Sequence, residues 1–434
     1  MSRTAPHNLV LALVAALLAV ACSEPEVAPA TISTDTAVAN DNGLGVNAGQ
    51  GSETTSETNP QAGQTDPADS AAIDVQIVDV GAVADTSPAK DTAAADVAKP
   101  KPIYTPAQAH CGNPAPAGSQ LAAAPKKYAG TCPKLVTDGT TKNKLTSSGA
   151  VREFVLLAPA DVTPTLSAGN SEKLPVLFAW HWLKGSAKSF VEKGEFAKAV
   201  NEQRFIAIVP ESKNDIIVPI PLIKSPISFP WPMLSLIEAK RVDEEHAFFD
   251  DMLACVAEQL PIDKECVSLT GVSAGALYGA QLASARSEHI ASYISLSGGV
   301  QSSAPFVNSF LIKWPQPKHK MPMMVLWGGP NDSCALLNFE AASQALEAHL
   351  DSAGAFLVEC IHNCGHGVPP VDAEQGKSQF AALWDFAFSH PYWLPVGQSP
   401  WAKQLPAAAP SWCAIGSGTA KIRTGACGEP SCPL

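Results

Sequence analysis

The chain has 434 residues, of which 46% are hydrophobic, and a formal net charge of −12, which suffices for one large domain or for one domain and a tail. Residues 23–100 hold 13 acidic and 2 basic side chains, so the part after residue 100 is nearly neutral, at −2. The acidity therefore says nothing about the partners of the folded part. The absence of a basic patch argues against nucleic acid as a partner.

The first 21 residues have the features of a secretion signal, with a short polar start and an apolar run that ends in small side chains. The run is too short for a comfortable membrane-spanning helix. Its end, Leu-Ala-Val-Ala-Cys, resembles the lipobox of bacterial lipoproteins, although Ala19 stands where leucine is usual. The resemblance implies that Cys22 is lipidated as the mature N-terminus, and that Ser23 directs the protein to the outer membrane. The alternative is an ordinary signal cleaved near residue 21.

Residues 23–100 are rich in Ala, Thr, Asp, Gly, Ser and Pro and contain neither an aromatic residue nor a cysteine. Such a stretch cannot bury enough apolar surface to offset the entropy lost on ordering. We therefore predict that residues 22–100 form a disordered tether that begins at the lipidated cysteine and holds an enzyme away from a membrane surface.

From residue 101 on, apolar runs alternate with helical patterns. Strands are predicted at residues 151–158, 174–180, 205–210, 266–270, 293–297, 323–327 and 355–361. Helices are predicted at residues 243–259, 276–284, 338–350 and 373–388. This alternation predicts a mostly parallel sheet that is covered by helices on both faces. Ligands bind at the carboxyl ends of the strands in such a sheet.

The segment at residues 212–236 departs from this pattern, because it places several prolines among apolar residues. Proline builds neither a helix interior nor a central strand. An apolar loop of this kind is either packed against the domain or exposed over a cleft. We favour a lid or a substrate-binding wall over plain packing.

The sequence Gly-Val-Ser-Ala-Gly at residues 271–275 lies between a predicted strand and a predicted helix. This strand–turn–helix context is the one that the serine nucleophile of a hydrolase requires. A serine held on a strained turn needs small residues two positions to either side, and both are glycine here. Ser273 is therefore the candidate nucleophile; the alternative is a tight turn with a solvated serine.

A serine hydroxyl becomes a good nucleophile when a histidine takes its proton and a carboxylate orients that histidine. Asp332 follows the predicted strand at residues 323–327, and His366 follows the next strand between two glycines. The order Ser, Asp, His is that of the α/β-hydrolase arrangement. His362 is the second candidate for the base, and a turn-capping role is the alternative for Asp332.

A tetrahedral intermediate also needs hydrogen-bond donors for its oxyanion. One donor is expected to be the backbone N–H of Ala274, directly after the nucleophile. We predict the second at Trp182 or Leu183, in the loop that follows the strand at residues 174–180.

Residues 151–394 resemble the secreted poly(3-hydroxybutyrate) depolymerase and feruloyl esterase group of α/β-hydrolases. The shared features begin with the Gly-Val-Ser-Ala-Gly turn at residues 271–275, called the elbow below, and an acidic helix before it. They also include a Trp-Gly-Gly-x-x-Asp acid loop and a Gly-His loop near the end. The chain departs from the group at His181-Trp182, where the group has His-Gly. The resemblance implies an α/β-hydrolase fold, hydrolysis of carboxylic esters without a cofactor, and a substrate site to which Trp231 and His181 contribute.

Eleven cysteines in a chain with an export signal indicate an oxidising compartment and disulfides, and lipidation of one of them leaves an even ten. Cys255 and Cys266, on the helix and strand before the elbow, are predicted to bridge. A bridge between Cys334 and Cys364 would hold the acid and base loops together, and it would resemble the arrangement in polyester-cleaving relatives. Cys360 is the alternative to Cys364. Zinc is the rival interpretation of the cysteines, but paired C-x-x-C units are missing.

These features together predict a catalytic domain at residues 101–405 and a tail at residues 406–434 that is rich in Cys, Gly and Pro. The predicted function is that of a lipid-anchored, extracytoplasmic serine esterase with no metal or cofactor. Its substrate would be a polyester or a feruloyl or other aryl ester. The alternatives are a catalytically inactive, surface-binding lipoprotein and a serine peptidase.

Overall fold

A computed structural model describes residues 104–164, 172–218, 226–428 and 432. The predicted secretion signal at residues 1–21, the lipidated Cys22 and the acidic tether lie outside the described residues. Within the described ranges, no helix is both long enough and apolar enough to cross a membrane.

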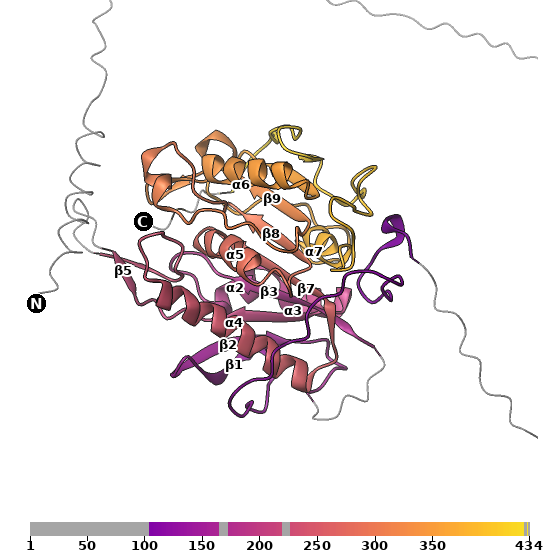
Figure 1. The fold of residues 1–434 in the computed structure, drawn as a ribbon. Helices are drawn as coiled ribbons and strands as arrows, with labels where there is room; N and C mark the ends of the chain where they lie inside the picture. The colour runs from indigo at the N-terminus through magenta and orange to yellow at the C-terminus, as the bar shows by residue number, and fades with distance from the viewer. Residues whose placement is uncertain (1–103, 165–171, 219–225, 429–431, 433–434) are drawn as a thin grey trace, which may run out of the picture. The chain divides into compact units, whose positions relative to one another are not determined.

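A sheet of nine strands forms the centre of the described part of the chain, in the order β1-β2-β4-β3-β7-β8-β9-β12-β13 (Figure 1). All pairings from β4 to β12 are parallel. The pairings at the two edges, β1–β2, β2–β4 and β12–β13, are antiparallel. The strands are β1 (Asp138–Ser147), β2 (Ala150–Leu157), β3 (Leu174–Trp180), β4 (Ile206–Pro210), β7 (Ile262–Val272), β8 (Ser292–Leu296), β9 (Met323–Trp327), β12 (Leu357–Ile361) and β13 (Cys413–Ile415).

Six α-helices and several short elements complete the described part. The helices are α2 (Ala187–Lys193), α3 (Phe196–Gln203), α4 (Ala239–Gln259), α5 (Ala274–Ala285), α6 (Phe339–Ala353) and α7 (Ala381–Phe388). Two small hairpins are β5 (Ile216–Val218) with β6 (Ile227–Phe229), and β10 (Ser333–Cys334) with β11 (Leu337–Asn338). The 3-10 turns are η1 (Pro106–Gln108), η2 (Phe306–Phe310) and η3 (Gly329–Asn331).

The sheet is covered on both faces because alternate side chains of its strands enter two separate apolar clusters. On β3, Phe178 belongs to the cluster that includes α4, where its ring lies 4.6 Å from that of Phe249. The neighbouring Leu177 belongs to the other cluster, together with Phe196 of α3. All seven residues of β3 are buried, as expected for a central strand without a solvent face.

Most of the predicted elements are present with small shifts of their ends. The helix predicted at residues 243–259 begins one turn earlier, and the helix predicted at residues 373–388 spans only α7. Strand β1 was not predicted, because it is polar and exposed at most positions, as edge strands often are. The segment at residues 212–236 contains the β5–β6 hairpin; within it, residues 219–225 lie outside the described part.

Among the described residues five disulfides link ten cysteines, and the predicted pairs are wrong. Cys255 bonds to Cys132, and Cys266 bonds to Cys111. Cys334 and Cys364 do not bond to each other, because each bonds to the C-terminal segment: the pairs are Cys334–Cys432, Cys364–Cys427 and Cys360–Cys413. With these cysteines oxidised, thiolate zinc sites are not available to the described part of the chain.

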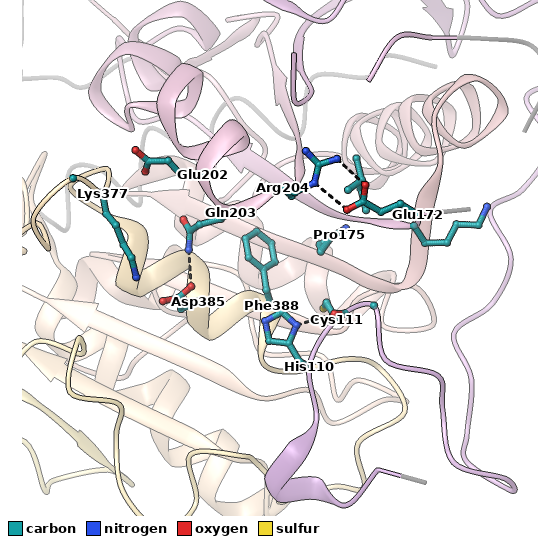
Figure 2. A pocket seen from close by; sticks show the side chains of 14 residues that line it. His110, Cys111, Glu172, Pro175, Glu202, Gln203, Arg204, Lys377, Asp385 and Phe388 are labelled. Atoms are coloured by element: carbon teal, nitrogen blue, oxygen red, sulfur yellow. Dashed lines mark hydrogen bonds and ion pairs between the residues drawn. The ribbon is translucent and has the colours of Figure 1, made fainter. Parts of the chain in front are cut away.

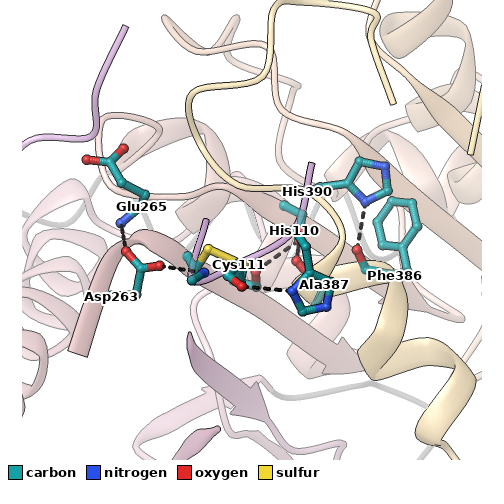
Figure 3. Close-up of a disulfide and its surroundings, with 11 residues drawn as sticks. His110, Cys111, Asp263, Glu265, Phe386, Ala387 and His390 are labelled. Atoms are coloured by element: carbon teal, nitrogen blue, oxygen red, sulfur yellow. Dashed lines mark hydrogen bonds between the residues drawn. A yellow bond between two sulfur atoms is a disulfide. The ribbon is translucent and has the colours of Figure 1, made fainter. Parts of the chain in front are cut away.

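The bond between Cys111 and Cys266 ties the N-terminal segment to β7 (Figure 3). Beside it, the carboxylate of Asp263 accepts hydrogen bonds from the backbone N–H groups of Gly112, at 3.1 Å, and Glu265, at 3.0 Å. The segment before the first strand is therefore anchored to the central sheet both covalently and by hydrogen bonds.

The C-terminal segment is part of the domain, which corrects the predicted boundary at residue 405. Its strand β13 pairs with β12, and Glu359 of β12 accepts hydrogen bonds from the backbone N–H groups of Gly418, Thr419 and Ala420. The sequence conceals this strand because it is only three residues long and lies among Gly and Pro.

Candidate active site

Ser273 lies on a strained turn between the end of β7 and the start of α5. Its backbone has φ 54° and ψ −120°, which non-glycine residues seldom adopt. A Cβ on Gly271 would lie 2.5 Å from the carbonyl oxygen of Gly275, and a Cβ on Gly275 would lie 2.0 Å from that of Trp180. Both glycines are therefore required by close backbone packing around the serine.

The three predicted catalytic side chains form one hydrogen-bonded chain. The Oγ of Ser273 lies 2.9 Å from Nε2 of His366, and Nδ1 of His366 lies 2.7 Å from Oδ1 of Asp332. Asp332 is fully buried, while the other two are exposed by only 6–7%. Three loops that follow the parallel strands β7, β9 and β12 thus bring serine, acid and base together at one edge of the sheet.

The second carboxylate oxygen of Asp332 is also satisfied. Its Oδ2 accepts from the backbone N–H of Gly328 at 2.7 Å and from the hydroxyl of Ser297 at 2.8 Å. The His366 ring stacks on Phe339, with 4.2 Å between ring centres. These contacts hold the Asp332 carboxylate and the His366 ring in one orientation. Ser297 was not predicted from the sequence, where its only signal is its place directly after strand β8.

The acid and base loops touch each other through their backbones. The N–H of Gly365 donates to the carbonyl of Gly328 at 3.1 Å, and a Cβ on Gly328 would lie 1.8 Å from the carbonyl oxygen of Gly365. Since Cys334 and Cys364 lie two residues from the acid and the base, their disulfides secure these loops to the C-terminal segment.

His362, the second candidate for the base, is not part of the hydrogen-bonded chain. It is 1% exposed, and its Nδ1 accepts from the backbone N–H of Cys364 at 3.2 Å. Burial lowers the pKa of His362 to about 4, so the ring is neutral and braces the base loop.

The predicted substrate contacts Trp231 and His181 are both buried in the core, which corrects their assignment. The indole N–H of Trp231 donates to the carbonyl of His181 at 2.7 Å, and the Trp231 ring packs edge-on against Trp180. Burial lowers the pKa of His181, whose Nδ1 lies 2.9 Å from the Trp182 carbonyl. A tryptophan in an apolar segment can enter the core because its N–H finds a partner there.

Trp182 and Leu183 line a cavity that Ser273 also lines and that is described below. Ala274 is the first residue of α5. The turn at Ser273 packs against the segment that follows β3, since a Cβ on Gly275 would also meet the His181 carbonyl oxygen at 2.7 Å. The backbone N–H groups in the first turn of a helix have no partner within that helix. The residues predicted to supply the two oxyanion donors thus belong to adjoining backbone segments.

A cavity of about 220 Å³ opens at Ser273 and His366. Its remaining walls are largely apolar and include four aromatic side chains: Trp182, Phe190, Phe380 and Trp384. This volume is enough for a short acyl chain or one aromatic ring.

A larger cavity, of about 710 Å³, includes the start of β3, at the opposite end of that strand (Figure 2). Its charged groups are largely paired with one another: Arg204 binds the carboxylates of Asp161 and Glu172, and Gln203 donates to Asp385 at 2.6 Å. None of the three predicted catalytic residues lines it, so its size does not make it the reactive site.

No group of three or more His, Cys, Asp or Glu side chains in the described ranges is arranged to hold a metal ion.

No protein-family model and no curated protein matches the chain. Among solved structures, native sOPH matches with a TM-score of 0.52 and 20% identity, covering 67% of this chain and 98% of that one. A complex of pOPH with DMSO matches with a TM-score of 0.52 and 17% identity, covering 69% and 99%. A ferulic acid esterase matches with a TM-score of 0.40 and 14% identity, covering 57% and 96%.

The chain has the α/β-hydrolase fold, as the sequence predicts. At 17–20% sequence identity, the likeness to these solved structures establishes the fold alone. In architecture the chain is similar to native sOPH and to pOPH.

Proposed function

We propose that this chain is an extracytoplasmic serine esterase that hydrolyses carboxylic esters through an acyl-enzyme. The observation that carries the proposal is the unbroken hydrogen-bonded chain of Ser273, His366 and Asp332 at the mouth of an apolar cavity. Such an arrangement activates a hydroxyl for acyl transfer.

In the proposed mechanism, Oγ of Ser273 attacks the ester carbonyl carbon while Nε2 of His366 takes the hydroxyl proton. Asp332 holds the ring through Nδ1 and stabilises the imidazolium that forms. The tetrahedral intermediate then expels the alcohol, which receives the proton from His366. A water molecule, deprotonated by the same histidine, hydrolyses the acyl-enzyme and regenerates the serine.

The oxyanion is proposed to accept hydrogen bonds from the backbone N–H of Ala274 and from that of Trp182, with Leu183 as the alternative. Trp182 is favoured because the carbonyl group of the His181–Trp182 peptide is held by a hydrogen bond in the core. The carbonyl of His181 and the N–H of Trp182 belong to one planar trans peptide and point in opposite directions. Trp231 binds that carbonyl in the core, which turns the N–H away from the core.

The proposed substrates are polyesters of the polyhydroxyalkanoate type or feruloyl and other aryl esters, since the cavity admits a short chain or one ring. Export and membrane attachment through Cys22 are proposed from the sequence. Five disulfides support an oxidising compartment.

The test is hydrolysis of 4-nitrophenyl acetate and butyrate by the purified domain and by Ser273→Ala. We expect turnover that the substitution abolishes, and labelling by a fluorophosphonate that is lost with it. Equal, background-level rates for both proteins would favour the catalytically inactive, surface-binding lipoprotein instead. Labelling that persists in Ser273→Ala would identify a different serine as the nucleophile.

A further inference from the structure

The lining of the cavity at Ser273 includes a lysine, Lys193, at the end of α2. Apart from this lysine, the serine, His366 and Ser297, the lining residues are apolar or glycine. The Nζ of Lys193 lies 5.1 Å from the centre of the Trp182 ring. A cation over an aromatic face is attracted to it, so the ammonium group is held against the cavity wall.

This ammonium group has no carboxylate partner among the described residues. None of the ion pairs in that part of the chain involves Lys193, and the two acids nearest to it in sequence are engaged elsewhere. Glu192 pairs with Lys188 at 3.7 Å, and a carboxylate oxygen of Glu195 accepts from the backbone N–H of Gln379 at 2.8 Å. Lys193, an exposed residue of the cavity lining, thus brings a positive charge to a largely apolar cavity without a counter-ion from the described residues.

Given the ester hydrolysis proposed at Ser273, we propose that Lys193 selects esters that carry a carboxylate on the group that fills the cavity. An unpaired anion would not enter an apolar site, because it would lose its hydration without compensation. Paired with the lysine, the carboxylate retains a partner while the apolar remainder of the group contacts the aromatic walls. The substrate class is therefore that of esters with a short apolar or aromatic body and one terminal carboxylate.

The experiment compares two matched pairs of probes. In one pair the carboxylate is on the acyl half: 4-nitrophenyl hemiglutarate against 4-nitrophenyl valerate. In the other it is on the alcohol half: 4-carboxyphenyl butyrate against phenyl butyrate. Each is measured with the wild type, Lys193→Gln, Lys193→Arg and Lys188→Gln. The last variant lies on the same helix and removes the same charge away from the cavity lining.

We expect Lys193→Gln to lower kcat/KM for the charged probe of one pair by about three- to ten-fold relative to its neutral twin. Lys193→Arg should restore the ratio, Lys188→Gln should leave it at the wild-type value, and about 0.5 M salt should weaken the preference. The affected pair identifies the half of the ester that occupies the cavity.

Unchanged ratios in both pairs after Lys193→Gln would overturn the role of Lys193. If the neutral probes were still turned over in a Ser273-dependent manner, the proposed esterase function would stand without it. If no probe gave Ser273-dependent turnover, both proposals would fail. Circular dichroism of each variant verifies folding, which an exposed lysine should not affect.

Discussion

Replacing Trp231 with phenylalanine tests whether the core of the protein positions the oxyanion donor. The substitution retains an aromatic ring but removes the N–H that binds the His181 carbonyl at 2.7 Å. Both residues are fully buried, so water cannot take over the lost contact. The peptide that carries the Trp182 N–H would then be free to rotate.

The expected magnitudes follow from this geometry. A buried acceptor left without its donor costs about 1–3 kcal/mol, and the smaller ring costs roughly a further 1–2 kcal/mol in lost burial. Removal of one oxyanion donor lowers kcat by about 10²–10³-fold in known enzymes. Because rotation weakens the donor without deleting it, we expect kcat to fall at least about ten-fold, with KM changing by less than about three-fold.

The assay is steady-state hydrolysis of 4-nitrophenyl butyrate together with thermal unfolding. Trp180→Phe is the matched control, since Trp180 lies in the same aromatic cluster and is equally buried. Its indole N–H has no hydrogen-bond partner among the described residues, so this substitution removes ring area alone. Equal losses of kcat in the two variants, or an unchanged kcat in Trp231→Phe, would refute the reasoning.

Three further predictions concern the elbow, a buried acid and a disulfide. Gly275→Ala should abolish soluble expression or activity, because its Cβ would lie 2.0 Å from a backbone oxygen. Glu347→Gln should remove a pH dependence of stability: burial raises the pKa of Glu347 to about 8, above its unfolded value of 4.5, so the free energy of unfolding should fall as pH rises between these values. Replacing Cys364 and Cys427 with serine removes a disulfide that joins residues 63 positions apart. The free energy of unfolding should fall by about 4 kcal/mol, and kcat should fall as well.

Two of these predictions have a control variant, and the other has an outcome that would contradict it. Gly428→Ala, where nothing lies within 4 Å of the new Cβ and φ is not positive, separates the elbow clash from a general effect of replacing a glycine. Equal urea denaturation midpoints of the wild type and Glu347→Gln across pH 5–8 would contradict the second prediction. For the third, removal of Cys111–Cys266 should cost at least as much stability while sparing kcat, because that bond lies away from the acid and base loops.

The catalytic candidates could be predicted because their signals are local. The elbow at residues 271–275 is defined by glycines at fixed spacing, and Asp332 and His366 each follow a strand. Parallel strands present their carboxyl ends at one edge of the sheet, so residues at those ends converge wherever they occur in the chain. Local pattern and sheet geometry together were thus sufficient for the fold class and the Ser, Asp, His order.

Contacts between distant segments could not be predicted in this way. Ten cysteines allow many pairings, and only the packed chain brought Cys334 and Cys364 to the C-terminal segment instead of to each other. The same holds for Trp231, whose apolar surroundings in the sequence are compatible with either a substrate wall or the core. Its buried hydrogen bond to His181 decides for the core.

What the sequence determined by itself was a strand–turn–helix segment around Ser273 within a mostly parallel α/β sheet, since residue size and periodicity act over a few neighbouring positions. The tertiary structure alone decided which groups support and surround that elbow: Ser297 on the acid, the disulfides on the loops, and Lys193 at the cavity. These residues are separated along the chain by tens of positions, and their proximity arises only when the sheet and its helices pack together.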